Sequence, residues 1–61
     1  MPVIIVKMLE GRTVEQKRGL VKAITDAVME YTGAPAEAVD VIIEDHARTD
    51  WGKAGKLYSD K

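Results

Sequence analysis

Apolar residues dominate the start of the chain from Val3 to Leu9, and this run predicts a β-strand. Its first four residues are β-branched and do not alternate with polar ones, a pattern typical of strands covered on both faces, as in parallel sheets. A second apolar run, from Val39 to Glu44, predicts another strand of this kind. The segment from Glu10 to Arg12 is expected to turn the chain after the first strand.

Between the two predicted strands, the apolar positions follow the spacing of an amphipathic helix. The stripe consists of residues three or four apart: Leu20, Ile24, Val28 and Tyr31, widened by Val21 and Ala27. Thr13, followed three residues later by Gln16, indicates a capping box at the start. Gly33 is typical of the left-handed residue after the last turn, and Pro35 prevents the helix from resuming. We therefore predict a helix from Val14 to Thr32.

A strand, a helix and a strand of these lengths predict an α/β fold with one right-handed βαβ unit and parallel strands. Glycines at positions 52 and 55, between Trp51 and Tyr58, predict a turn or short hairpin at the C-terminus. No repeat or linker divides the sequence, so residues 1–61 are expected to form a single domain. One helix covers only one face of two strands, and open apolar edges would aggregate unless other copies cover them. We expect a dimer with a four-stranded sheet, and association of such dimers into a larger homo-oligomer.

The small size of the chain supports the same expectation. A chain of 61 residues hides only about 60% of the surface that its unfolded form exposes. Domains this small usually need disulfides, a metal or oligomerisation for stability. The sequence has no cysteine and one histidine, which excludes disulfides and leaves too few ligands for a typical metal site. Oligomerisation is the remaining source of stability, and no cofactor is expected.

Charge and hydropathy exclude several classes of partner. Nine basic and ten acidic residues are mixed along the chain and give a net charge of −1, so no basic stripe favours nucleic acid. No apolar run approaches the ~18 residues of a membrane span, and the N-terminus lacks the features of a signal peptide. The sequence therefore predicts a cytoplasmic protein that binds neither nucleic acid nor membranes.

Most common catalytic motifs are missing from the sequence. It has no cysteine nucleophile, no recognisable Ser, His and Asp set, and no phosphate-binding glycine loop. We interpret the GKAGK segment from Gly52 to Lys56 as a turn with two solvated lysines. His46, the single histidine, is interpreted as a surface or hydrogen-bonded side chain rather than a catalytic one. Trp51, the single tryptophan, is expected to fill a subunit interface or to line a ligand pocket, and in a small oligomer it can do both.

Pro2 is the residue whose position offers unusual chemistry. Removal of Met1 would leave it with a free secondary amine, held rigid by its ring. An apolar pocket and neighbouring cations would lower the pKa of this amine toward neutrality, where a general base works best. The structural alternative is a proline tolerated at the first position of a strand. If Met1 is retained, the nitrogen of Pro2 is an amide and cannot act as a base.

Several short motifs occur together in a fixed order: the N-terminal proline with its apolar strand, LEGRT at 9–13, EQK at 15–17, GAP at 33–35, VIIED at 41–45 and WGKAGK at 51–56. This set runs over nearly the whole chain without gaps and resembles the 4-oxalocrotonate tautomerase family. The resemblance implies a βαβ subunit of the tautomerase fold, with six subunits per assembly arranged as a trimer of dimers. It also implies cofactor-free keto–enol chemistry with the terminal proline as base.

The resemblance also gives roles to individual residues. Pro2 matches the general base, which takes a proton from one carbon of the substrate and returns it to another. Arg12 matches an arginine that binds a substrate carboxylate from a neighbouring subunit, and Trp51 matches a pocket aromatic that is commonly phenylalanine. The family's second active-site arginine, which polarises the substrate carbonyl, falls at Asp40. Arg48, eight residues later, is a candidate to supply the missing cation.

The residues and the resemblance together predict a cofactor-independent tautomerase or isomerase that acts on small 2-hydroxy-dienoate or enol-pyruvate carboxylates. An arylpyruvate-type enol suits a site in which Asp40 replaces an arginine. One alternative is the hydration or dehalogenation of a 3-substituted acrylate, with Asp40 activating water. The other alternative is a non-catalytic oligomeric βαβ module.

Overall fold

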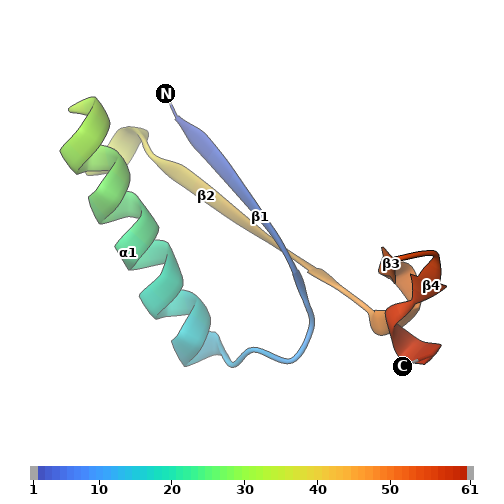
Figure 1. Ribbon diagram of the computed structural model, residues 1–61. Helices are drawn as coiled ribbons and strands as arrows, with labels where there is room; N and C mark the ends of the chain where they lie inside the picture. Colours follow the sequence, from blue (N-terminus) through green and yellow to red (C-terminus); the bar gives the residue numbers. More distant parts are fainter. Residues whose placement is uncertain (1, 61) are drawn as a thin grey trace.

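One helix lies along one face of two long strands in the computed structural model of the protein, which describes residues 2–60 (Figure 1). The chain forms β1 (Val3–Leu9), then α1 (Val14–Thr32), then β2 (Asp40–His46). β1 and β2 pair in parallel along all seven residues of each strand. The predicted βαβ unit with parallel strands is therefore confirmed.

A hairpin and three short 3₁₀ turns complete the chain. They are η1 (Ala36–Ala38) before β2, and η2 (Arg48–Asp50), β3 (Gly52–Lys53), β4 (Lys56–Leu57) and η3 (Tyr58–Asp60) after it. β3 and β4 pair antiparallel. The two residues between them, Ala54 and Gly55, have positive φ angles of 53° and 81°, as a two-residue turn of the I′ type requires. The C-terminal hairpin is confirmed, and both of its lysines are exposed.

β1 and α1 have the bounds that the sequence predicts, whereas β2 does not follow the predicted range Val39 to Glu44. The N–H of Val39 donates to the carbonyl of Ala36 at 3.1 Å, which closes η1 and leaves Val39 outside the ladder. At the other end, Asp45 and His46 remain paired with β1. The apolar pattern therefore missed the polar end of the strand, because backbone pairing continues past the last apolar residue.

Both ends of α1 are capped as predicted. The Thr13 hydroxyl accepts from the Gln16 N–H at 3.1 Å, and the Gln16 side chain accepts from the Thr13 N–H at 2.9 Å. Gly33 has a φ of 76°, and its N–H donates to the carbonyl of Met29 at 3.0 Å. No helix among residues 2–60 is long and apolar enough to cross a membrane.

The apolar stripe of α1 packs against the sheet only in part. Leu20, Ile24 and Val28 are half-buried, but Tyr31 is 83% exposed and Ala27 is exposed as well. The prediction that Tyr31 and Ala27 belong to the packed face is wrong for the single chain. The 19 residues of α1 span about 28 Å, whereas a seven-residue strand spans about 23 Å. The last turn of α1 therefore extends beyond the strands that the helix covers.

The two faces of the sheet have different surroundings. On the face toward α1, Lys17 pairs with Asp45 of β2 at 2.5 Å. Because strand side chains alternate between faces, the opposite face carries the odd-numbered residues of β1 and the even-numbered residues of β2; we call it the open face. Three of its apolar side chains are strongly exposed: Val3 and Ile5 at 54% each, and Ile42 at 46%.

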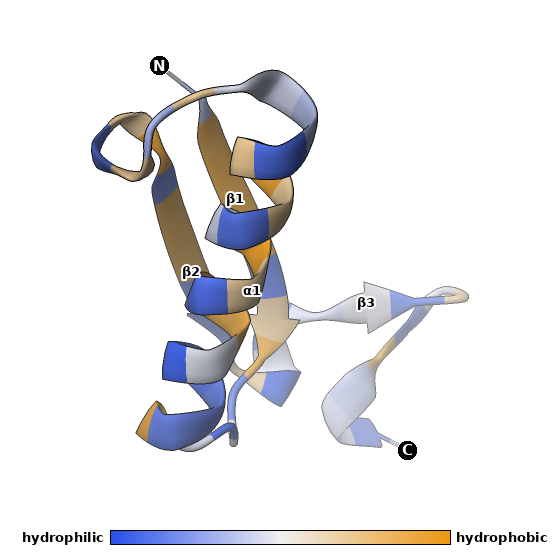
Figure 2. Cartoon of the chain, turned by 90° about the vertical axis from the view of Figure 1, so that its left-hand side faces the viewer, coloured by the Kyte–Doolittle hydropathy of each residue, from blue (hydrophilic) through white to orange (hydrophobic). Residues whose placement is uncertain are grey.

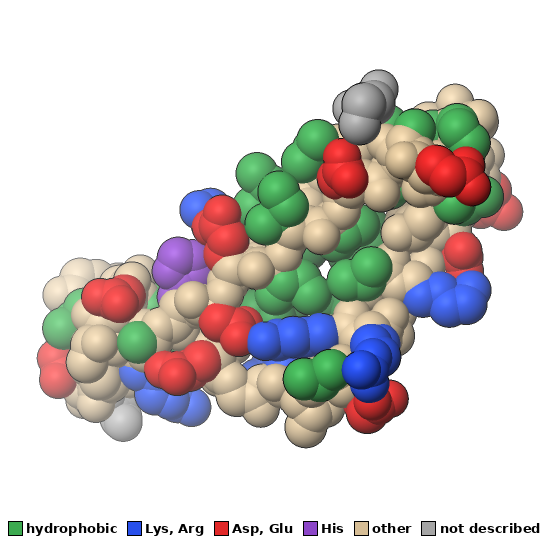
Figure 3. All heavy atoms as spheres, turned by 180° about the vertical axis from the view of Figure 1, so that it is seen from behind, with side chains coloured by type: hydrophobic (Ala, Val, Ile, Leu, Met, Phe, Trp, Pro, Cys, Tyr) green, Lys and Arg blue, Asp and Glu red, His purple; other side chains and the backbone are tan. Residues whose placement is uncertain are grey.

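The single chain has no enclosed core. None of the described side chains is fully buried, and in residues 2–60 each long strand has one edge without a partner strand. The strands are hydrophobic along much of their length (Figure 2). Hydrophobic side chains also reach the molecular surface over the strands (Figure 3). The uncovered face and free edges are as expected, and the homo-oligomer that would cover them stays a prediction.

Candidate active site

Pro2 lies directly before β1, where its missing N–H costs the sheet no hydrogen bond. Its carbonyl accepts from the N–H of Asp40 at 3.0 Å, which extends the pairing of β1 and β2 by one bond. Pro2 is half-buried. A base at this nitrogen would be fixed in position by the sheet. Met1, whose removal this role requires, lies outside the described residues.

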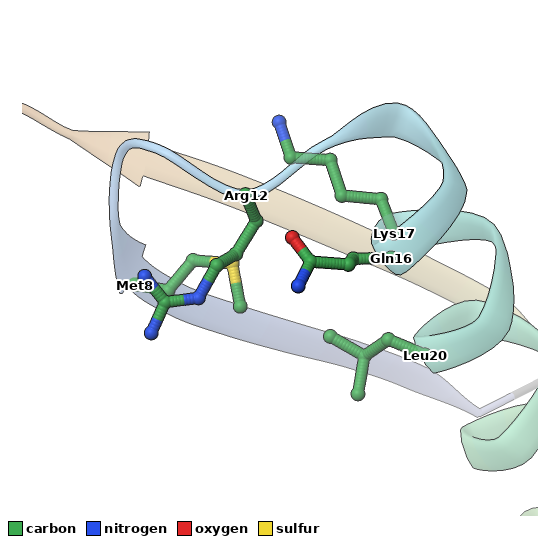
Figure 4. Close-up of a pocket in the computed structure, with 5 residues that line it drawn as sticks. All are labelled: Met8, Arg12, Gln16, Lys17 and Leu20. Atoms are coloured by element: carbon green, nitrogen blue, oxygen red, sulfur yellow. The ribbon is translucent and has the colours of Figure 1, made fainter.

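Arg12 lies in the turn after β1, at the opposite end of this strand from Pro2. It lines a cavity of about 210 Å³ between β1 and α1, together with Met8, Gln16, Lys17 and Leu20 (Figure 4). The Arg12 side chain extends over Met8, and Gln16 points toward it from α1 (Figure 4). Arg12 is exposed and has no ion-pair partner in the described part of the chain. Its guanidinium is therefore available to an anion from outside the chain.

The other polar groups of this cavity already have partners. Lys17 donates to Asp45 at 2.5 Å, and Gln16 is held by the capping box with Thr13. Met8 and Leu20 supply apolar surface. An unpaired guanidinium beside apolar walls suits a small ligand that has a carboxylate and an apolar part.

Asp40 begins β2 at the same end of the sheet as Pro2. Its Cα lies opposite that of Val3, and its side chain is exposed. By strand alternation Asp40 belongs to the open face, whereas the Arg12 cavity lies between β1 and α1. Within one chain, Asp40 does not join that cavity.

Trp51 lies just beyond β2, where the C-terminal hairpin begins. Its half-buried ring meets His46 edge to face, with ring centroids 6.0 Å apart and an interplanar angle of 68°. The Nε2 atom of His46 is screened from solvent and has no hydrogen-bond partner among residues 2–60. The His46 side chain as a whole is 33% exposed, in line with the predicted surface histidine, although its Nε2 atom makes no hydrogen bond within the described chain.

Arg48 is engaged by an aromatic ring. Its Cζ atom lies 5.2 Å from the centroid of the Tyr58 ring, which is within the range of a cation–π interaction. The backbone N–H of Tyr58 donates to the carbonyl of Trp51 at 2.8 Å. The full length of β2 separates Arg48 from Asp40, so the structure does not bring this arginine to Asp40 within one chain.

Glu44 lies beside Lys7 and His46 on the open face. Its Oε1 atom accepts from the Lys7 Nζ at 2.9 Å and lies 3.6 Å from the His46 Nε2. The hydrogen bond from Lys7, then its positive charge and the neighbouring His46, lower the pKa of Glu44 below its usual value of 4.5. Glu44 therefore remains ionised across the neutral range.

Within one chain, the residues nominated from sequence form two groups rather than one site. Pro2 and Asp40 lie at one end of the sheet, and Arg12, Arg48 and Trp51 follow the other ends of the strands. The two ends of a seven-residue strand are about 23 Å apart. No small substrate can contact both groups in a single copy of the chain.

Sequence reasoning missed the residues that surround Arg12 and Arg48. The i, i+4 spacing of Gln16 and Leu20 places them on one helix face, and this signal could have indicated the cavity wall. Nothing in the sequence connects Tyr58 with Arg48, because their contact depends on how the hairpin folds.

Comparison with known proteins identifies the family to which this fold belongs. A family profile described as "Tautomerase enzyme" matches residues 2–61. The crystal structure of YwhB, a homologue of 4-oxalocrotonate tautomerase, superimposes with a TM-score of 0.95 at 52% sequence identity, covering 98% of each chain. The chain belongs to the 4-oxalocrotonate tautomerase family.

Other members of the 4-oxalocrotonate tautomerase family are similar over their whole length. A 2-hydroxymuconate tautomerase from Bacillus subtilis (strain 168) is 53% identical over 60 residues, covering 98% of this chain and 97% of that protein. A probable tautomerase from Bacillus cereus is 51% identical over 61 residues, covering both chains completely. A second 4-oxalocrotonate tautomerase homologue of known structure has a TM-score of 0.95 at 43% identity, covering 100% of this chain and 97% of that one. The βαβ subunit with its hairpin is therefore a tautomerase fold, and the homologues of this chain are isomerases.

Proposed function

We propose that the protein is a cofactor-independent tautomerase of small 2-hydroxy-dienoate or enol-pyruvate carboxylates, with Pro2 as the general base. Membership of the family supports the reaction class. The B. subtilis relative is a 2-hydroxymuconate tautomerase, which supports the substrate class. In this proposal Arg12 binds the substrate carboxylate, and Trp51 forms an apolar wall of the site.

The proposed reaction moves one proton and needs no co-reactant. The secondary amine of Pro2, freed by removal of Met1, takes a proton from one position of the substrate and returns a proton at another position. Substrate and product are therefore isomers, and the amine returns to its starting state. The planar guanidinium of Arg12 can hold a carboxylate through two parallel hydrogen bonds, which fixes the orientation of the substrate.

Pro2 and the Arg12 cavity lie at opposite ends of β1. This separation supports a site that is shared between two copies of the chain. The outer edge of β1 has no partner strand among the described residues. When two copies pair these edges about a two-fold axis perpendicular to the sheet, the strands run antiparallel. This pairing brings Pro2 of one copy toward the Arg12 end of the second copy, so the dimer completes two equivalent sites.

The same pairing gives a four-stranded sheet with both helices on one side. The open face, with Val3, Ile5 and Ile42, is still uncovered in this dimer. Association of three dimers into a hexamer is the arrangement we propose to cover it.

Subunit mixing tests the shared site. Pro2→Ala and Arg12→Ala variants are unfolded, mixed in equal amounts and refolded, and turnover of the enol of phenylpyruvate is measured. Pro2→Ala alone is expected to lower turnover by ~10² to 10⁴, because a positioned base is replaced by a flexible primary amine. Arg12→Ala alone is expected to lower kcat/KM at least about tenfold, because the carboxylate loses its charged partner. After random mixing, about one quarter of the sites in a two-fold dimer combine an intact Pro2 from one copy with an intact Arg12 from the other. The activity of the mixture should therefore rise to about one quarter of the wild-type activity.

A second mixture provides the control. Pro2→Ala mixed with the Pro2→Ala, Arg12→Ala double variant contains no intact base and should gain nothing. If the first mixture gains nothing either, both residues act within one chain and the shared site is wrong. A wild-type protein that retains Met1 by mass spectrometry, or has no tautomerase activity, contradicts Pro2 as the base.

A further inference from the structure

We propose that Arg48 is a positioning residue: by stacking on Tyr58 it fixes the C-terminal hairpin and thereby the orientation of Trp51. This goes beyond the role of a substrate-binding cation that the sequence suggests for Arg48. The consequence for substrate binding rests on the proposed function of Trp51 as a wall of the site. The consequence for the Trp51 side chain does not depend on any activity.

Two contacts connect Arg48 to Trp51 through Tyr58. The Arg48 Cζ lies 5.2 Å from the centroid of the Tyr58 ring, and the Tyr58 N–H donates to the Trp51 carbonyl at 2.8 Å. Arg48 and Trp51 are three residues apart in the chain. The stacked guanidinium and the backbone hydrogen bond therefore close a small loop that holds the start and the end of the hairpin together.

On its other side, Trp51 contacts the sheet. The edge-to-face contact with His46 joins the indole to the last residue of β2, and edge-to-face pairs of this kind are favourable. Trp51 is thus held between the end of β2 and the hairpin. Its orientation should change when the hairpin loses its closing contact.

The strand pairing of the hairpin is short. β3 and β4 contain two residues each, all of them exposed, and an isolated two-stranded hairpin is at best marginally stable in water. Ala54 adopts a φ of 53°, which is unfavourable for a residue with a Cβ atom. Figure 1 shows the hairpin at the far end of β2, away from α1. The stacking of Arg48 on Tyr58 is therefore well placed to decide whether the hairpin keeps its shape.

The competing explanation is that Arg48 binds substrate directly, because a stacked guanidinium still presents N–H groups at its edge. The two explanations differ in what they require of Tyr58. A positioning role makes Arg48 and Tyr58 act as a unit, so losing either one has the same effect as losing both. A direct role makes the Arg48 effect independent of the Tyr58 ring.

A double-mutant cycle with Arg48→Gln, Tyr58→Leu and the combined variant distinguishes these roles in the full chain. Trp51 is the single tryptophan, so intrinsic fluorescence reports on this side chain alone. Each single variant is expected to shift the emission to longer wavelength and raise acrylamide quenching about two- to fivefold. The combined variant should match either single one. Arg18→Gln, which removes a charge from α1, is the matched control and should leave the emission unchanged.

Kinetics add a second readout to the same cycle. A displaced apolar wall should raise KM about two- to fivefold with little change in kcat, equally in all three variants. If Tyr58→Leu fails to fold, the Trp51 emission of Arg48→Gln without substrate still decides the proposal, because a direct substrate-binding role predicts no change in this emission. Unchanged Trp51 emission in Arg48→Gln overturns the proposal, as does a kcat loss in Arg48→Gln that Tyr58→Leu does not share. If wild type proves inactive, the proposed function fails but the fluorescence cycle still decides the role of Arg48.

Discussion

Arginine side chains in this chain differ in their surroundings, and the difference decides what each can do. Among residues 2–60, Arg18 pairs with Glu15 on α1, Arg48 stacks on Tyr58, and Arg12 has neither a carboxylate nor a ring partner. The sequence could nominate Arg12 and Arg48 as candidate cations through motif and proximity. It could not show which guanidinium is already engaged, because the partner of Arg48 lies ten residues away on another part of the hairpin.

Asp40 is the residue that we expect to decide which substrate the protein prefers. It is exposed on the open face beside Pro2, at the position where the resemblance places a carbonyl-polarising arginine. A positioned donor facing a developing oxyanion contributes roughly 10² to 10³ in rate. We therefore expect slow turnover of 2-hydroxymuconate by wild type, and a selective rise of about tenfold or more in Asp40→Arg. The ratio of kcat/KM for this dicarboxylate and for the enol of phenylpyruvate measures the effect.

Glu30→Arg is the charge-matched control for this comparison, since Glu30 is exposed on α1. Glu30→Arg should change kcat/KM for neither 2-hydroxymuconate nor the enol of phenylpyruvate. If wild type already converts the dicarboxylate efficiently and Asp40→Arg brings no gain, another cation polarises the carbonyl and the interpretation of Asp40 is wrong.

At the scale of elements, the sequence predicted what local chemistry specifies. The bounds of β1 and α1 follow from an apolar run, a capping box and a C-terminal glycine, all of which act within a few residues. The end of β2 was missed because Asp45 and His46 belong to the strand through pairing with β1 rather than through their own propensity. The pairing of Arg48 with Tyr58 was missed for a similar reason.

Gly33 gives a test of the helix end. Its φ of 76° lies in the left-handed region, which costs a residue with a Cβ atom about 1 kcal/mol. Gly33→Ala should therefore lower the free energy of unfolding by about 1 kcal/mol. Gly19→Ala, inside α1 with open space around the new methyl group, should raise it by up to about 1 kcal/mol. Urea denaturation followed by circular dichroism, at one fixed protein concentration, measures both, and equal effects of the two changes would contradict this account of the cap.

The ion pair between β1 and β2 predicts a pH dependence. The pKa of Glu44 in the folded chain lies below its usual value of 4.5 because Lys7 donates to it. This pair therefore contributes stability above pH 4.5 that is lost as the pH falls through the folded-state pKa. Both partners are partly exposed, so the contribution is modest and weakened by salt.

Glu44→Gln should make the stability of the protein less sensitive to acid below pH 4.5. Urea midpoints measured across the acid range in low salt give this slope for wild type and variant. Glu30→Gln removes an acid that forms no ion pair within residues 2–60 and should leave the wild-type slope unchanged. A wild-type slope in Glu44→Gln would mean that the pair with Lys7 does not stabilise the folded state.

At the scale of the whole molecule, the sequence predicted that a single copy is incomplete, and the structure agrees. None of the described side chains is fully buried, and within residues 2–60 the outer edges of β1 and β2 have no partner strand. This prediction succeeded because one helix can cover only one face of two parallel strands, which leaves the other face and the outer strand edges uncovered. The separation of Pro2 from Arg12 follows from the predicted bounds of β1, because one residue precedes this strand and the other follows it. How a partner copy would bring the two together could not be predicted, because that depends on which strand edges pair.

Assembly through the open face can be tested at Ile42, which is 46% exposed in the centre of β2. An aspartate at this position would be buried without a partner in the homo-oligomer, a penalty of several kcal/mol per subunit. Ile42→Asp should therefore shift the protein toward smaller, less stable species in sedimentation velocity at micromolar concentration, while wild type sediments as a hexamer. Tyr31→Asp, at the 83% exposed end of α1, carries the same charge and should keep the wild-type assembly. A wild-type monomer, or an Ile42→Asp protein that assembles normally, would show that the open face is not a subunit interface.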